Sequence, residues 1–136
     1  WNVSQLYPLH LALMLSFVPF AYFKFLLAFH MEHVSKKNED GDLPLHLACS
    51  TTNKNSREMM KLLLTINPDS TRILNGRGQT PLSLASQFGK YSEIDTIFKS
   101  APDTLLMKDP TTRLYPFMTA AVQRKHINDD QELEQL

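Results

Sequence analysis

The sequence predicts an all-α solenoid of stacked helix-turn-helix units joined by hairpin-like loops. The main observation is a six-residue pattern that occurs four times along the 136-residue chain. The copies are Tyr7–Ala12, Leu43–Ala48, Thr80–Ala85 and Tyr115–Ala120. Apolar residues at helical spacing follow the copies, and polar turn residues precede the last three. Self-similarity at a fixed period is the signature of repeat architectures, so this pattern determines the expected fold class.

Each copy of the pattern predicts the first helix of a unit. Its second residue is proline, and the four prolines are 36, 37 and 35 residues apart. Proline is tolerated at the first helical position and holds the residue before it in an extended conformation. Leucine and alanine three residues apart, such as Leu9 and Ala12, share one helical face, and the small alanine lets a second helix approach. The pattern therefore predicts an extended arm that enters the inner helix of a helix pair.

A second apolar segment predicts an outer helix in each unit. Its apolar residues are Met59, Met60, Leu63 and Leu64 in one unit, and Ile94, Ile97 and Phe98 in the next. Their spacing places them on one face of a helix. Polar residues at 50–56 and Gly89-Lys90 separate these helices from the inner ones. We expect the outer helices to end at 67–70 and 101–104, because proline forbids continuation and aspartate or serine forms a local turn.

Turn-forming residues stand just before three copies of the pattern, at 38–41, 75–78 and 109–112. Asparagine, aspartate and glycine favour tight turns between chain segments. These segments predict hairpin-like tips, and the tip before the fourth copy is one residue longer than the others.

This combination of period, Asn/Asp-x-x-Gly turn and Pro-Leu-His-Leu-Ala segment resembles ankyrin repeats. The resemblance covers nearly the whole chain as one domain, 1–136, with repeats at about 2–37, 38–74, 75–108 and, in part, 109–136. The family's usual Thr-Pro-Leu-His segment pairs its threonine with its histidine, whereas no copy here has both residues. We therefore expect a diverged array that is less stable per repeat than the family consensus.

The first repeat is unusually apolar, and residues 11–29 are long enough to be considered as a transmembrane helix. Pro19, however, aligns with Asn55 in the loop between helices of the next repeat, and Lys24 would cost about 2.5–3.5 kcal/mol at a bilayer centre. Two helices are therefore favoured over one. A preceding repeat is the favoured cover for the apolar surface at 9–29, because internal repeats are apolar on both faces. A partner protein and a membrane remain as alternatives.

Composition narrows the expected partners and surroundings. The formal charge is zero and the pI is near 7.1, so no global field attracts nucleic acid or anionic lipid. Cys49 is the single cysteine, which excludes an internal disulfide and a cysteine-rich zinc site. A reducing compartment follows, and we expect an intracellular, cytoplasmic protein.

The sequence predicts no enzyme, no cofactor and no metal site. His30, Glu32 and His33 lie close together, but zinc needs three or four protein ligands, and the sequence offers no further histidine or cysteine pair nearby. Histidine near a helix C-terminus also interacts favourably with the helix dipole, which is the preferred interpretation. His10 and His46 occupy equivalent repeat positions, which indicates a structural role. No combination of nucleophile, base and orienting residue emerges.

The resemblance implies a scaffold or adaptor that binds a protein partner through its tips and inner helices. Carried onto this sequence, the implied binding residues are Glu39, Asp40, Asp42, Ser50, Thr51, Arg77, Gln79, Gln87, Phe88, Arg113 and Gln123. Tip chemistry changes from acidic at 39–42 to basic at Arg77 and Arg113, which suggests electrostatic register. Phe88 is the candidate anchor, since exposed aromatic residues often dominate interfaces. A regulatory ankyrin domain of a larger enzyme or membrane protein is the alternative function.

Overall fold

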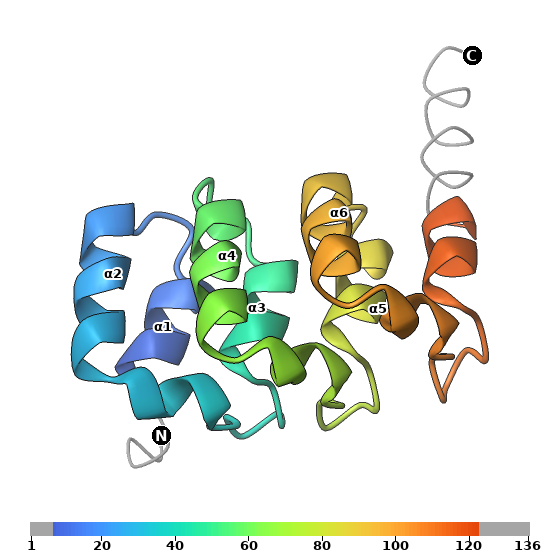
Figure 1. The fold of residues 1–136 in the computed structure, drawn as a ribbon, viewed down its shortest axis with the longest axis horizontal. Helices are drawn as coiled ribbons and strands as arrows, with labels where there is room; N and C mark the ends of the chain where they lie inside the picture. The colour runs from blue at the N-terminus through green and yellow to red at the C-terminus, as the bar shows by residue number, and fades with distance from the viewer. Residues whose placement is uncertain (1–6, 123–136) are drawn as a thin grey trace, which may run out of the picture.

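The computed structural model describes residues 7–122, and they form a row of helix pairs (Figure 1). The inner helices are α1 (Pro8–Met14), α3 (Pro44–Ser50) and α5 (Pro81–Gln87), and the outer helices are α2 (Phe20–Phe29), α4 (Ser56–Ile66) and α6 (Tyr91–Ser100). A further helix covers 116–122. No strand occurs between residues 7 and 122. The predicted all-α solenoid is confirmed.

The inner helices begin where the prolines predict. Pro8, Pro44 and Pro81 are each the first residue of a helix, and the residue before each is extended. Leu43, for example, has φ −75° and ψ 161°. Proline thus acts twice, because its ring fixes a helical φ and excludes a helical conformation from the preceding residue.

Each outer helix is followed by a short 3₁₀ helix, and the second and third of these 3₁₀ helices begin with proline. These 3₁₀ helices are η2 (Met31–Ser35), η3 (Pro68–Arg72) and η4 (Pro102–Leu106). The same hydrogen bond closes each outer helix: the N–H groups of His30, Asn67 and Ala101 donate to the carbonyls of Leu26, Leu63 and Ile97. The three bonds occupy equivalent positions, so they show which residues of the outer helices correspond to one another.

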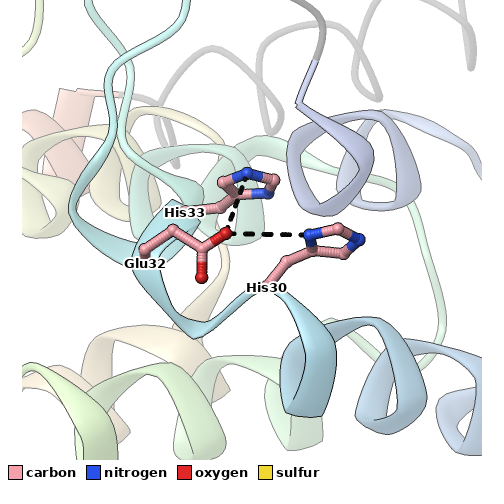
Figure 2. Close-up of side chains that lie close together, drawn as sticks. All are labelled: His30, Glu32 and His33. Carbon is pink, nitrogen blue, oxygen red and sulfur yellow. Dashed lines mark ion pairs between the residues drawn. The ribbon is translucent and has the colours of Figure 1, made fainter.

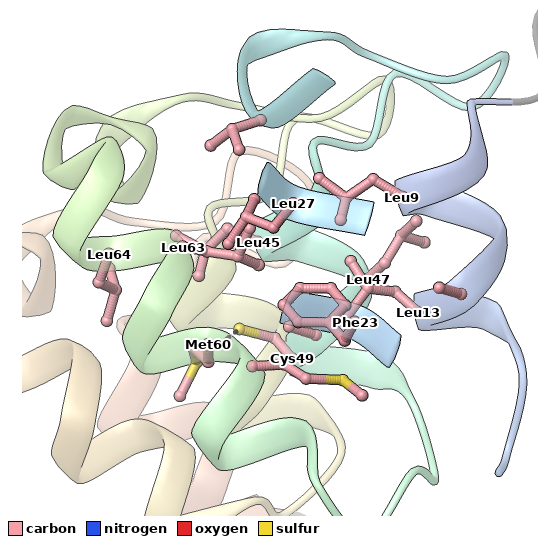
Figure 3. Packing of buried hydrophobic residues seen from close by; sticks show 14 of the residues in the cluster. Leu9, Leu13, Phe23, Leu27, Leu45, Leu47, Cys49, Met60, Leu63 and Leu64 are labelled. Atoms are coloured by element: carbon pink, nitrogen blue, oxygen red, sulfur yellow. Dashed lines mark hydrogen bonds between the residues drawn. The ribbon is translucent and has the colours of Figure 1, made fainter. Parts of the chain in front are cut away.

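The core lies between the two rows of helices and continues from one pair to the next (Figure 3). Met59, Met60 and Leu63 of α4 are completely buried, as the spacing predicts. Ala48 on α3 is also completely buried, at the position where a small residue lets the outer helix approach. On α6 only Ile97 of the predicted apolar set is fully buried, whereas Phe98 is 42% exposed.

The apolar segment 11–29 forms two helices rather than one. The loop 15–19 separates α1 from α2, and it contains Pro19 as predicted. Val18 in this loop is buried against the core. Within residues 7–122 no helix has both the length and the apolar character needed to cross a bilayer.

Polar contacts connect each helix pair to its neighbour. His10 Nε2 lies 2.8 Å from the Lys36 carbonyl, and His46 Nε2 lies 3.0 Å from the Gln79 carbonyl. The backbone N–H of Leu43 donates to His46 Nδ1, so the His46 proton resides on Nε2 and is donated to Gln79. The predicted role of tying turn to helix is confirmed for His46, which also ties its pair to the next. His10 binds the chain that leaves its own pair after η2.

No copy of the pattern has both the threonine and the histidine of the family's usual segment, but a histidine in one copy and a threonine in another each still form a hydrogen bond at the start of their helix. His46 caps its helix although residue 43 is leucine. Thr80 caps α5 by accepting the N–H of Ser83 at 3.2 Å, although no histidine follows it. A helix cap of this kind contributes about 1 kcal/mol.

Candidate functional site

The hairpin tips lie side by side along one edge of the row (Figure 1). In the first tip, the Asn38 carboxamide oxygen accepts the N–H groups of Asp40 and Asp42 at 3.0 and 2.9 Å. Asn75 accepts the N–H groups of Arg77 and Gln79 at 3.0 and 2.9 Å in the second tip. These side-chain bonds add to the backbone turn bonds that Gly41 and Gly78 donate to the Asn38 and Asn75 carbonyls, and they give both tips one shape.

Adjacent tips are joined directly through their backbones. The N–H of Gly76 donates to the Asp40 carbonyl at 3.1 Å. A Cβ atom on Gly76 would lie 2.3 Å from that carbonyl oxygen, so only glycine allows this approach. The Asn75 carboxamide also donates to the Asp42 carboxylate at 2.8 Å. The tips therefore present one continuous, fixed surface.

The third tip follows the same plan with a longer turn. Asp109 accepts the N–H groups of Thr111 and Thr112, both at 2.8 Å. Burial raises the pKa of the Asp109 carboxyl, but these hydrogen bonds outweigh burial and hold the pKa below its usual value. Arg113 has φ 60°, the left-handed conformation that Gly41 and Gly78 adopt in the other tips.

A groove with a volume of about 690 Å³ runs between the first two tips. Exposed Glu39 and Asp40 line it on one side and exposed Arg77 on the other. None of these three side chains forms an ion pair within the part of the chain that the structure describes. Their charges are therefore available to an external group.

A second hollow, of about 180 Å³, lies between α5 and the helix at 116–122. Gln79 lines this hollow, and its side-chain amide donates hydrogen bonds to Gln87 at 3.1 Å and to Asp109 at 3.4 Å. Phe88 ends α5 and is 52% exposed. The tips and inner helices thus expose charged, amide and aromatic groups.

The model of the ankyrin repeat family matches residues 40–72, which contain α3, α4 and η3. This match identifies residues 40–72 as an ankyrin repeat. The chain is also 37% identical over 62 residues to a protein of Rickettsia bellii (strain RML369-C) that carries the name ankyrin repeat protein. That match covers 46% of this chain and 34% of the relative, so the chain spans about a third of the relative's length.

Ankyrin repeats are generally modules for binding other proteins, and most of the predicted binding residues lie on the surface. Six are exposed in the described structure: Glu39, Asp40, Arg77, Gln87, Phe88 and Arg113. Ser50 and Gln79 are half-buried. Gln123 lies outside the described residues.

Asp42 and Thr51 were expected on the surface, and the structure buries both. Asp42 is 7% exposed, because the Asn75 carboxamide of the neighbouring tip covers its carboxylate. Thr51 is 8% exposed at the end of α3; its hydroxyl accepts the N–H of Asn53, and its carbonyl accepts a hydrogen bond from Lys90. Both residues hold ankyrin units together.

Lys37 is a groove residue that the sequence analysis missed. It lines the groove beside the first tip, and its ammonium group donates to the Leu74 carbonyl at 3.0 Å. Its position immediately before the Asn38 turn could have predicted that it lies beside the first tip. Phe117 and Met118, on the helix at 116–122, are also exposed and were not predicted.

A third group of polar side chains lies at the junction of α2 and η2 (Figure 2). Glu32 Oε1 is 3.8 Å from His30 Nδ1 and 3.5 Å from His33 Nε2. Burial lowers the pKa of the His33 imidazole, the main effect among several. The sequence places all three residues close together, and the structure adds that one Glu32 oxygen lies between the two imidazoles.

Proposed function

We propose that this chain is a protein-binding scaffold or adaptor module whose partner docks on the hairpin tips and inner helices. The observation that carries the proposal is the groove between the first two tips, with acidic groups on one side and Arg77 on the other. The proposed domain is residues 1–136, with repeats at about 2–37, 38–74, 75–108 and, in part, 109–136.

The charges support a partner segment of mixed sign. Glu39 and Asp40 would contact a basic group, while Arg77 and Arg113 would contact acidic groups further along the row. Exposed complementary charges mainly fix orientation and association rate, so they support specificity more than affinity. A chain with zero net charge is suited to such recognition because no bulk attraction overrides the local pattern.

Phe88 supports the proposal as the apolar anchor. Phe88 is 52% exposed at the end of α5 and follows Gln87, whose exposed amide accepts a hydrogen bond from Gln79. Aromatic residues surrounded by polar groups are enriched among residues that carry most of the binding energy.

The test uses a partner recovered by affinity capture with the chain and then purified. We expect the double variant Arg77→Glu/Phe88→Ala to weaken binding by about 3 kcal/mol or more, measured by calorimetry, because it removes both an anchor and a complementary charge. The matched control is Lys61→Glu/Phe98→Ala on the outer helices, where both side chains are also exposed. Unchanged affinity of the first variant would refute the proposed surface.

The end of the row at α1 supports a second binding role. Leu11 is 45% exposed, whereas the residues at its repeat position, Leu47 and Leu84, are 9% and 1% exposed. The outer helix shows the same difference: Tyr22 is 53% exposed, but the aligned Met59 is completely buried. These positions are buried only where another helix pair lies against them.

We infer that a further ankyrin-type helix pair covers this end, from the same chain or from a partner. Fusing one consensus ankyrin repeat ahead of α1 should raise the midpoint of thermal unfolding, because stacking buries apolar surface. Tyr22→Glu should abolish that gain, while Leu106→Glu, a similarly exposed site at η4, should preserve it. A fusion that unfolds no later than the parent chain would contradict this role.

A further inference from the structure

Two histidine side chains are brought together by the 3₁₀ geometry of the segment after α2. The His30 carbonyl accepts the N–H of His33 at 3.0 Å, closing a turn between residues three apart. Side chains at this spacing eclipse one another in a 3₁₀ helix. The two imidazoles consequently stack in parallel, with centroids 4.7 Å apart and planes inclined by 4°.

Glu32 adds a carboxylate to this pair (Figure 2). Its Oε1 atom lies 3.5 Å from His33 Nε2 and 3.8 Å from His30 Nδ1. The three potential ligand atoms all lie within 4.8 Å of one another. Donor atoms this close need only small side-chain rotations to surround one ion at about 2.0–2.2 Å each.

The surroundings fix the histidines before any ion binds. Tyr7 packs against the His33 ring with centroids 4.8 Å apart, on a contact separate from His30. The backbone of His30 is held by its N–H bond to the Leu26 carbonyl at 2.9 Å. Binding would therefore order few additional groups, which lowers its entropic cost.

We propose that His30, Glu32 and His33 form a binding site for a divalent transition-metal ion, with Zn²⁺ the best match. Two imidazoles and one carboxylate are ligands that zinc accepts, and three protein ligands leave a fourth position for water. The Glu32 side chain is 63% exposed and the His30 side chain 36% exposed, so the ion has a path from solvent. The site holds the end of α2 to η2 and is separate from the proposed protein-binding surface.

The test is calorimetric titration of the full chain with Zn²⁺ in a buffer free of chelators. We expect a single-site isotherm for the parent chain. His30→Gln and Glu32→Gln should each weaken binding by about tenfold or more, because even residues that only orient metal ligands change affinity by about 10–100-fold. Both side chains project to solvent in part, so these variants should keep the fold, which circular dichroism checks.

His126→Gln is the matched control, since it removes a histidine without changing the three ligands, and we expect unchanged affinity. Co²⁺ provides an independent readout: the parent chain should give the intense visible absorption of a four-coordinate site, and His30→Gln should lose it. Zinc affinity that is equal in the parent and Glu32→Gln chains, or lost in His126→Gln, would overturn the assignment.

Discussion

Individual residues make the close packing of neighbouring tips possible, and Gly76 is the clearest case. Its missing side chain leaves room for the Asp40 carbonyl and for the hydrogen bond that joins the tips. Gly89 differs, because its φ of +64° requires glycine while nothing lies within 4 Å of an added Cβ atom. Gly76 is thus required by a steric contact, whereas Gly89 is required by its backbone conformation.

Gly76→Ala should lower the free energy of unfolding by about 2–4 kcal/mol, through the clash and the lost hydrogen bond between tips. Gly89→Ala should lower it by about 1–2 kcal/mol, the cost of a left-handed conformation alone. Urea denaturation of both variants checks the order. A smaller loss for Gly76→Ala than for Gly89→Ala would contradict the tip contact.

Buried histidines make stability depend on pH. Burial lowers the pKa of His46, and it does the same for His10 and His33. The unfolded chain binds protons with a histidine pKa of about 6.5, so unfolding takes up protons below that pH. The histidines therefore stabilise the fold above about pH 6.5, and this contribution is lost as the pH falls toward their lower folded pKa values.

The free energy of unfolding should decrease between pH 7 and pH 5, measured by urea denaturation in the presence of a chelator. The carboxyl groups of Glu93 and Asp109 also have lowered pKa values, but their contribution is lost only below about pH 4.5. A stability that is constant or rises on acidification across this range would contradict the account.

At the scale of elements, most of the fold was predictable because its signals are local. Proline sets the start of α1, α3 and α5 through the backbone of two adjacent residues. The apolar spacing in 59–64 identifies the buried face of α4 in the same way. Such features depend on near neighbours, which the sequence displays directly.

What could not be predicted depends on partners from another repeat. Asp42 is buried by Asn75, and Thr51 receives Lys90, residues that lie more than thirty positions further along the chain. The sequence also shows that His30, Glu32 and His33 are close together, but the stacking of the two imidazoles depends on the 3₁₀ turn that follows α2. Whether a residue such as Asp42 or Thr51 is exposed therefore depends on the neighbouring repeat and not only on its own segment.

At the scale of the whole molecule, contacts between repeats extend over the full width of the row. On the outer side, Ser56 donates to the Glu93 carboxylate at 2.8 Å, and Arg72 binds the Asp103 carboxylate through two nitrogens, at 2.9 and 2.8 Å. On the tip side, Gly76 binds Asp40. Because each repeat contacts only its neighbours, these bonds add to the apolar stacking that holds the second and third repeats together.

This continuity leaves the tips and inner helices as a fixed surface that a partner could contact across several repeats at once. The exposed groups on it, among them Asp40, Arg77 and Arg113, extend over neighbouring units rather than forming one deep pocket. A fixed surface binds with little loss of conformational entropy, which favours recognition of a protein over a small molecule.

Hydrogen–deuterium exchange of the chain with and without its purified partner tests the central claim most directly. The account predicts slower exchange on binding in the tips at 38–42 and 75–79 and at the end of α5. Exchange in the outer helices α4 and α6 should stay unchanged. Protection confined to the outer helices, with the tips exchanging as in the free chain, would contradict the proposed function.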